Sequence, residues 1–193
     1  MKKIVAFDFD GTLTSKDTFV AFIRFVFGTR AFWLGFLRYS HLLVLMMLHL
    51  YPNDKTKEKV FGHFFRGMNI EDFNQLCQKF AASNRDLLRP KGNETLAKAE
   101  AEGAEVLIIS ASIDNWVQPF FPQVKVLGTQ IEVAEGKLTG RFLSNNCFGE
   151  EKVNRLRALY PYRQEYYLTA YGDSRGDKEL LAYADESFLK PFR

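Results

Sequence analysis

The chain has 193 residues, 47% hydrophobic and 19 of them phenylalanine, so it can bury the core of one domain, or of one domain with a large insertion. Its formal net charge of +3 is small and its basic residues form no dense tract, which argues against nucleic-acid binding. Cys77 and Cys147 match no metal-ligand spacing, and the basic amino terminus reaches Asp8 too soon for a signal peptide. These features predict a reduced, cytoplasmic protein with two free thiols.

The first predicted element is a buried strand over residues 4–7, with Asp8 and Asp10 at its end and Gly11 as the residue that breaks it. Residues two apart in an extended chain point the same way, so the two aspartates are expected to project together. Two carboxylates that close repel each other unless a cation or a shared proton compensates. The pair therefore indicates a metal site with chemistry. The alternative is a turn with two solvated acids.

The next part of the chain shows no convincing strand. Its hydrophobic pattern predicts helices at 17–28, 30–50, 55–66 and 70–83. We therefore expect two domains, an α/β core of residues 1–14 and 85–193 and an all-helical insertion of residues 15–84 that lies over the end of the first strand.

The second helix of the insertion, 30–50, is unusually apolar, although Arg38 and His41 interrupt it. Its uninterrupted apolar run, 42–48, is well short of the roughly 20 residues that span a bilayer. A helix buried within the insertion or against the core is the favoured interpretation. A surface that contacts lipid, with the protein associated peripherally with a membrane, is the alternative.

After the insertion, strands alternate with helices. Strands are predicted at 105–110, 124–128 and 166–173, and helices at 93–103, 113–121, 150–160 and 175–184. This order is typical of a doubly wound, mainly parallel α/β sheet with helices on both faces.

Ligands bind such sheets outside the carboxyl ends of the strands, where Asp8, Ser110 and Asp173 are expected to converge. Two alternating segments within 130–142 flank Glu135-Gly136 and predict an antiparallel hairpin appended to the sheet.

Four segments, in order, resemble the motifs of the haloacid dehalogenase superfamily, in its phosphoserine-phosphatase-like branch. They are Asp8-Phe9-Asp10-Gly11-Thr12, Ile108-Ile109-Ser110-Ala111-Ser112, Lys152 in its helix, and Gly172-Asp173-Ser174-Arg175-Gly176-Asp177. The resemblance implies a Rossmann-like core with a helical cap inserted after the first motif. It also implies Mg²⁺-dependent phosphoryl transfer from a phosphomonoester through an aspartyl-phosphate.

The resemblance implies a role for each matching residue. Asp8 would be the nucleophile and Asp10 the general acid and base, and Asp10 favours a phosphatase because expulsion of a halide needs no acid. Ser110 would donate a hydrogen bond to the phosphoryl group, with backbone N–H groups at the start of the next helix. Lys152 would offset negative charge. The phosphate would be bound by Gly11, Thr12, Ser110, Ala111 and Lys152.

For Mg²⁺, the resemblance implies Asp8, the backbone carbonyl of Asp10, and Asp173 as ligands, with Asp177 as a further ligand or as an acid that orients the others. Structural alternatives remain for several of these residues. Ser110 would also suit a helix N-cap, a lysine such as Lys152 is commonly solvated, and Asp173 and Asp177 would also suit the start of a helix.

The sequence indicates the substrate less directly than it indicates the reaction. Ser110-Ala111-Ser112 departs from the Ser-Gly-Gly of phosphoserine phosphatases, and their cap arginine has no single counterpart among Arg24, Arg30, Arg38 and Arg66. Asp17-Thr18-Phe19, the apolar helix and the segment before Lys152 resemble a bacterial branch that includes phosphatases of phosphatidylglycerophosphate. That lipid or a related apolar phosphate is the favoured substrate. Phosphoserine or another small phosphate, a phosphotransferase, and a non-catalytic binding module are the alternatives, and the oligomeric state is left open.

Overall fold

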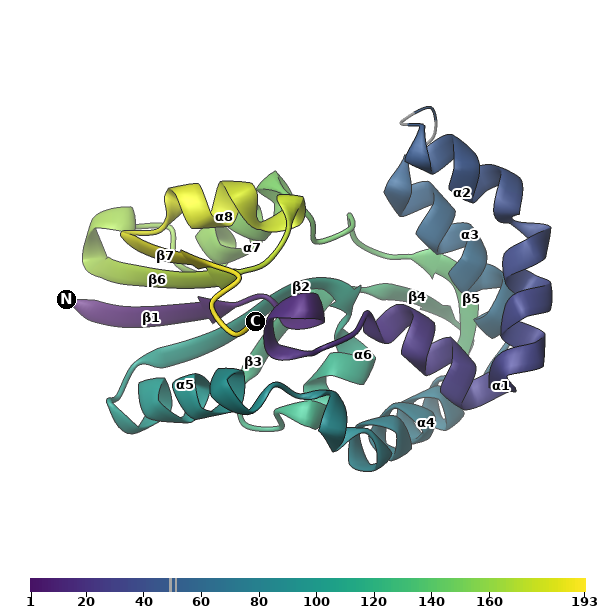
Figure 1. The fold of residues 1–193 in the computed structure, drawn as a ribbon, viewed down its shortest axis with the longest axis horizontal. Coiled ribbons are helices and arrows are strands. Elements are labelled where there is room, and N and C mark those ends of the chain that lie inside the picture. The colour runs from purple at the N-terminus through teal and green to yellow at the C-terminus, as the bar shows by residue number, and fades with distance from the viewer. Residues whose placement is uncertain (49, 51) are drawn as a thin grey trace.

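The computed structural model describes residues 1–48, 50 and 52–193, and its centre is a five-stranded sheet in the order β3-β2-β1-β6-β7 (Figure 1). Every neighbouring pair of strands is parallel, which confirms the predicted sheet type. The strands are β1 (Lys2–Phe7), β2 (Glu105–Ile113), β3 (Lys125–Thr129), β6 (Tyr166–Gly172) and β7 (Glu186–Leu189).

Helices cover both faces of this sheet, because alternate residues of each strand point to opposite sides. In β1, Phe7 packs with the apolar cluster that includes α5 (Pro90–Ala101) and α6 (Asp114–Val117). Ile4 and Ala6 pack in a second cluster, with α7 (Glu150–Leu159) and α8 (Lys178–Tyr183). Figure 1 shows α5 on one side of the sheet and α7 and α8 on the other. The doubly wound prediction is confirmed.

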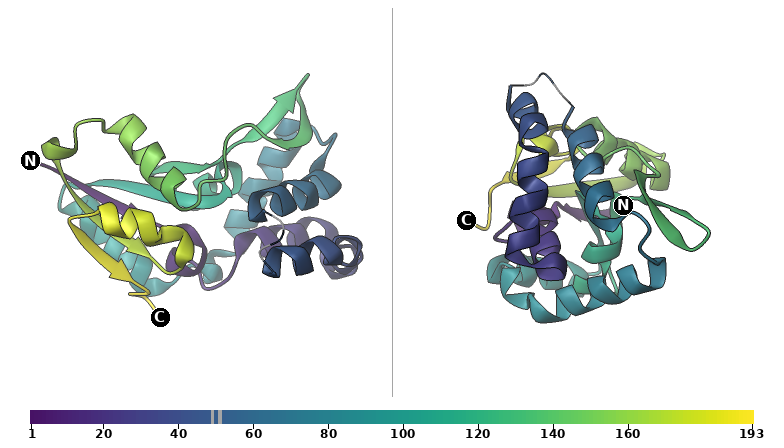
Figure 2. Two further views of the ribbon diagram at one scale, coloured as in Figure 1. Left: turned by 90° about the horizontal axis from the view of Figure 1, so that it is seen from above. Right: turned by 90° about the vertical axis from the view of Figure 1, so that its right-hand side faces the viewer.

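The predicted hairpin is also present, as β4 (Ile131–Ala134) and β5 (Lys137–Phe142), paired antiparallel apart from the large sheet. Glu135 (φ 50°) and Gly136 (φ 73°) form its turn, with the two positive φ angles that a tight hairpin requires. Both views of Figure 2 show the hairpin extending away from the five-stranded sheet. It is tied to the helices, since the N–H of Phe142 donates to Glu58 Oε2 at 2.9 Å.

The insertion consists of α1 (Thr18–Arg38), α2 (Ser40–Met47), α3 (Asn53–Phe65) and α4 (Ile70–Ser83). Gly28, at φ 80° and ψ 166°, breaks α1 where the sequence predicts the end of one helix and the start of the next. The prediction of one helix over 30–50 is wrong at Tyr39, which caps α1 before α2 begins. One residue of the predicted range, His49, lies outside the described residues.

Aromatic packing joins this helical segment to the sheet domain. The ring of Phe22 in α1 lies within 5.0–5.6 Å, centroid to centroid, of four buried rings from α3, α4 and α6, namely Phe65, Phe73, Phe80 and Trp116. The first half of α1, α3 and α4 therefore share one apolar core with a face of the sheet.

The remaining differences from prediction are at element ends and in one strand that was missed. β2 continues to Ile113 with a register shift after Ile109, and α6 starts at Asp114 and is followed by the helical turn η3 (Gln118–Phe120). β7 was not predicted. Its four residues are all exposed, so the strand lacks the apolar pattern that marks buried strands.

Four further helical turns complete the fold, η1 (Phe9–Leu13), η2 (Arg85–Leu87), η4 (Arg163–Glu165) and η5 (Arg175–Asp177). Cys77 and Cys147 are both buried and free, as the sequence predicts.

Candidate active site

A cavity of about 550 Å³ lies between the carboxyl ends of β1, β2 and β6 and the helical segment. Asp8 after β1, Ser110 within β2 and Asp173 after β6 all line it. The three strand ends meet here as the sequence predicts, because parallel strands place their carboxyl ends at one edge of the sheet.

The chain leaves β1 in a turn rather than as a continued strand. Asp8 is extended, with its N–H on the carbonyl of Tyr171 at 2.9 Å, and residues Phe9–Leu13 then form η1. Gly11 is at φ 80°, and a Cβ there would lie 2.4 Å from Asp173 Oδ2, so only glycine fits this approach. Asp8 and Asp10 both line the cavity, but the turn aims them at different partners.

Asp8 is buried and held at both carboxylate oxygens. Its Oδ1 accepts from Lys152 Nζ at 2.6 Å, and its Oδ2 accepts from Thr12 Oγ1 at 2.9 Å. Burial raises the pKa of Asp8 to about 7, with a further rise from Asp177, while Lys152 opposes the rise. The Thr12 hydroxyl is thus used to orient Asp8, and the Gly11 N–H donates to Thr14 at 3.2 Å.

Lys152 connects two of the acids. Its Nζ lies 2.6 Å from Asp8 Oδ1 and 2.6 Å from Asp177 Oδ1, and only 2% of its side chain is exposed. The alternative of a solvated lysine is therefore wrong. Burial alone would lower the pKa of Lys152, but the two carboxylates raise it above its usual range.

Asp177 organises the loop that carries Asp173. Its Oδ2 accepts from the N–H of Asp173, the N–H of Ser174 and the hydroxyl of Ser174, each at 3.0 Å. Burial works against the charged form, but Lys152 and these hydrogen bonds lower the pKa of Asp177. Asp177 also closes a capping box with Ser174, so the helix-start alternative holds alongside the ion pair with Lys152.

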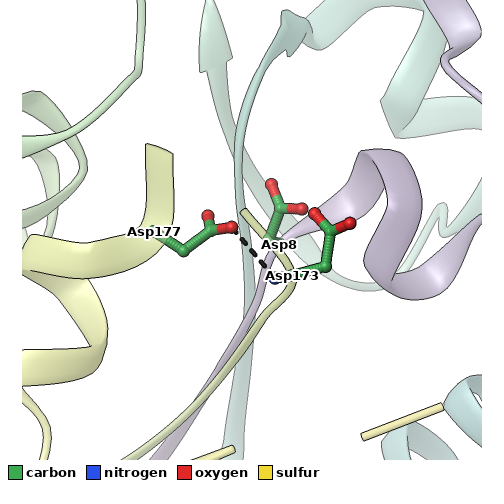
Figure 3. A group of neighbouring side chains, drawn as sticks. All are labelled: Asp8, Asp173 and Asp177. Atoms are coloured by element: carbon green, nitrogen blue, oxygen red, sulfur yellow. Dashed lines mark hydrogen bonds between the residues drawn. The ribbon is translucent and has the colours of Figure 1, made fainter. Parts of the chain in front are cut away.

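Asp173 is buried beside Gly11, and Arg193 donates to its Oδ2. Burial raises the pKa of Asp173, although Arg193 opposes the rise. Figure 3 shows the Asp8 and Asp173 carboxylates side by side, with the hydrogen bond from the Asp173 backbone to Asp177.

These residues fit a magnesium ion. One carboxylate oxygen from each of Asp8, Asp173 and Asp177 lies within 4.8 Å of the other two. Buried carboxylate oxygens are hard ligands of the kind Mg²⁺ prefers. Within the described residues, only Lys152 and Arg193 form ion pairs with the three acids, so the cluster retains excess negative charge. The carboxylate of Asp10 is not part of this cluster.

Asp10 instead faces the helical segment and β2. Its Oδ1 accepts from the N–H of Thr18 at 2.8 Å and from the Thr18 hydroxyl at 2.7 Å, and its Oδ2 accepts from the hydroxyl of Ser112. Burial, followed by the charge of Asp17, raises the pKa of Asp10. Asp10 is therefore held apart from the acid cluster at the edge of the same cavity.

Ser110 and Ala111 lie in β2 rather than at a helix start. The Ser110 hydroxyl accepts from the N–H of Ser112 at 3.1 Å, and α6 begins only at Asp114 with no side-chain cap. The N-cap alternative for Ser110 is therefore wrong. The carbonyl of Ala111 accepts from Lys57 Nζ at 2.7 Å.

Lys57, in α3, is a cavity residue that sequence reasoning missed. Its Nζ lies 5.5 Å from the centroid of the Phe19 ring, and burial lowers its pKa. None of the four arginines considered as the cap arginine, Arg24, Arg30, Arg38 and Arg66, lines the cavity, whereas Lys57 does. Nothing in the sequence distinguishes Lys57 from its neighbour Lys55, which is exposed.

The side of the cavity formed by the helical segment is mixed in character. Its apolar residues are Phe19, Val20, Phe36 and Val60, which we call the apolar wall, and Lys57 lies beside Phe19. Its other polar residues are Ser15, Lys16, Asp17, Asn53 and Thr56. The cavity thus combines a floor of paired charges with an apolar wall and further polar side chains.

Comparisons with known proteins found relatives that match most of this chain. A model of the haloacid dehalogenase-like hydrolase family matches residues 5–182. Protein CicA of Caulobacter vibrioides is 36% identical over 197 residues, which cover 98% of this chain and 86% of that protein.

Solved structures share the fold at lower identity. A protein of unknown function from Bordetella pertussis Tohama I has a TM-score of 0.85 at 18% identity, covering 97% of this chain and 89% of that chain. A substrate-bound phosphoserine phosphatase has a TM-score of 0.64 at 18% identity, covering 98% and 86%.

Proposed function

The chain belongs to the haloacid dehalogenase-like hydrolase family, and we propose that it is a Mg²⁺-dependent phosphatase that hydrolyses a phosphomonoester through an aspartyl-phosphate on Asp8. One observation carries this proposal. Buried Asp8 is paired with Lys152 beside Asp173 and Asp177, at the floor of the cavity. A carboxylate held in this way is protected from bulk water and positioned for in-line attack on a bound phosphate.

In the first step, a carboxylate oxygen of Asp8 attacks phosphorus and the bond from phosphorus to the leaving alcohol oxygen breaks. Asp10 donates a proton to that oxygen. Asp8, Asp173 and the backbone carbonyl of Asp10 would hold the Mg²⁺, whose charge offsets the repulsion between a carboxylate and an anionic ester. Lys152 supplies a second compensating charge at 2.6 Å from Asp8.

In the second step, water attacks phosphorus, its proton passes to Asp10, and the bond between phosphorus and Asp8 breaks to release inorganic phosphate. Thr18 and Ser112 hold Asp10 in position for both proton transfers. Because the Ser110 oxygen accepts from Ser112, its own O–H is available to donate to a phosphoryl oxygen. Ala111 would contribute a backbone contact beside it.

We assign the core, residues 1–14 and 85–193, to catalysis and residues 15–84 to a cap that selects the substrate in the cytoplasm. The apolar wall and Lys57 support an apolar phosphate such as phosphatidylglycerophosphate. The wall would contact the hydrophobic part, and Lys57 a charged group of the head. A phosphoserine-like substrate would instead pair its carboxylate with Lys57.

A substrate panel tests the proposal. The purified protein with Mg²⁺ is assayed on phosphatidylglycerophosphate in micelles, phosphoserine, glycerol 3-phosphate and p-nitrophenyl phosphate. We expect kcat/KM to be at least about tenfold higher for the lipid, a difference of roughly 1.4 kcal/mol in transition-state binding. A higher kcat/KM for a soluble phosphate would reject the lipid as the preferred substrate, while the proposed phosphatase activity would stand. Hydrolysis of p-nitrophenyl phosphate that survives EDTA would reject the metal-dependent mechanism.

A further inference from the structure

The second half of α1, α2 and the turn after α2 carry a set of exposed apolar side chains, which we call the outer apolar face. All six are between 53% and 72% exposed, namely Trp33, Leu34, Leu37, Val44, Leu48 and Leu50. Figure 1 shows this part of the chain at the end of the molecule remote from β6 and β7. An exposed apolar patch of this kind marks an interaction site more often than a bare surface.

Between Arg30 and Arg38, the second half of α1 is apolar all round. Its inner side is buried, since Phe32 is enclosed and a Cβ on Gly35 would lie 2.3 Å from the ring of Phe64. Its outer side repeats Trp33 and Leu37 one helical turn apart, where a soluble protein places polar residues. Packing against α3 therefore explains the apolar residues on the inner side of this helix and does not explain those on its outer side.

The charge of this segment identifies the partner. Between Thr18 and Asn53 the chain has three arginines and no aspartate or glutamate, so the segment carries the whole formal net charge of +3. Arg30 and Arg38 lie four residues to either side of Leu34, and both are exposed. Within the part of the chain that the structure describes, no carboxylate forms an ion pair with either. Apolar residues beside unpaired arginines match an anionic lipid surface, whereas a second copy would place arginine against arginine.

We propose that the outer apolar face binds the surface of an anionic lipid bilayer. Trp33, Leu34 and Leu37 enter the headgroup region, and Arg30 and Arg38 contact lipid phosphates. Phe36, between these residues in the same helix, lines the cavity, so a bound protein has its cavity next to the lipid. Entry of a lipid substrate from that bilayer rests on the proposed function, whereas binding to the bilayer does not.

The attachment is peripheral. α1 is long and apolar enough to cross a membrane by length and composition. However, Gly28 breaks it, and Phe22 and Ile23 in its first half are buried in the aromatic core. Removing that half from the protein would expose the core it shares with the sheet domain, so only the second half is free to meet lipid.

The full chain provides its own probe, because Trp33 is 60% exposed and the only other tryptophan, Trp116, is fully buried. The wild-type protein is mixed with phosphatidylcholine vesicles containing about one third phosphatidylglycerol, and with vesicles of phosphatidylcholine alone. We expect flotation with the anionic vesicles and a blue shift of tryptophan emission, both weaker with neutral vesicles and at high salt. Trp33→Phe should abolish the shift and retain flotation.

The variant Leu34→Glu/Leu37→Glu should lower partitioning into anionic vesicles at least about tenfold, because it removes two apolar contacts and adds two negative charges. Val133→Glu/Leu143→Glu is the matched control, since it adds the same charges at exposed apolar positions in and beside the β4–β5 hairpin. Arg30→Ser/Arg38→Ser provides a second variant, which should weaken binding to anionic vesicles only. Thermal unfolding confirms that each variant is folded.

Absence of wild-type binding to anionic vesicles would overturn the proposal, as would equal binding by the Leu34→Glu/Leu37→Glu variant. A loss of mass in that variant by ultracentrifugation would also overturn it and assign the face to a second copy. Hydrolysis of p-nitrophenyl phosphate without vesicles is measured in parallel. Absence of hydrolysis would reject the proposed phosphatase activity and would not affect the conclusion about membrane binding.

Discussion

The floor and the wall of the cavity are built in different ways. The floor is made of buried charges that hold one another, with Lys152 between Asp8 and Asp177 and Arg193 on Asp173. The wall consists of four apolar side chains of the helical segment, and Lys57 beside it contacts the floor through the carbonyl of Ala111. Charges at the floor require a fixed geometry, whereas an apolar wall tolerates many side chains of similar volume. We therefore propose that reaction type and substrate choice are encoded in separate parts of the chain.

The largest expected effect comes from the floor. Asp8→Asn should lower kcat/KM by about 10⁴ or more on every substrate, because an amide cannot form the acyl phosphate. The assay is phosphate release from p-nitrophenyl phosphate and from the preferred substrate. Unequal losses of kcat/KM on the two substrates would show that the floor also selects the substrate. Catalysis and substrate choice would then not belong to separate sets of residues.

Lys152→Met should have the next largest effect. It leaves Asp8 and Asp177 without their shared cation, so activity should fall by about 10²–10³ and the free energy of unfolding by about 3–5 kcal/mol. Denaturant unfolding and steady-state kinetics measure the two losses. Lys98→Met, at an exposed lysine that pairs with Glu102, is the control and should change stability by less than about 1 kcal/mol. A similar result for both variants would mean that the floor does not depend on its buried pairs.

Lys57→Met tests the wall. We expect kcat/KM to fall by about tenfold for the preferred substrate and much less for p-nitrophenyl phosphate, because Lys57 contacts no group of the acid cluster. Lys55→Met, at the exposed lysine two residues earlier, should leave both rates unchanged. Equal losses of kcat/KM on both substrates would place Lys57 with the catalytic groups. The wall and the floor would then not have separate functions.

Gly28→Ala should have the smallest effect and acts within the helical segment. At φ 80° and ψ 166° the backbone is in a region that alanine avoids, although a Cβ there would meet no atom within 4 Å. We expect about 1–3 kcal/mol of destabilisation from backbone strain alone, measured as a lower Tm. Because Gly28 does not line the cavity, kcat on p-nitrophenyl phosphate should be retained. A large fall in kcat would show that the orientation of the two halves of α1 affects the catalytic residues of the floor.

The floor could be predicted from the sequence because its residues sit at fixed places in short local patterns. Asp8, Ser110 and Asp173 each lie at or near the end of an apolar run, and parallel strand ends converge on one edge. The prediction was wrong about the end of β2, which was expected at Ser110. β2 extends to Ile113, so Ser110 lies within the strand, while α6 begins at Asp114, one residue after the predicted helix start.

The wall could not be predicted in the same way. Lys57 donates to Ala111, 54 residues away in the chain, and no pattern in the sequence around Lys57 indicates that contact.

Two other features were missed for different reasons. The break at Tyr39 lies within an apolar stretch, and the apolar pattern there gave no sign of where one helix ends and the next begins. β7 was missed because an exposed edge strand is stabilised by pairing with β6 rather than by an apolar pattern of its own.

The two buried thiols have a practical consequence. Burial raises the pKa of Cys147 to about 11 and that of Cys77 higher still, so at neutral pH neither forms the thiolate that maleimides modify. The native chain is therefore already a background for selective labelling. A single Leu34→Cys or Val44→Cys substitution would take one spin label or fluorophore at a chosen point of the outer apolar face. The depth of that label in a bilayer can then be read from collisional quenching, residue by residue.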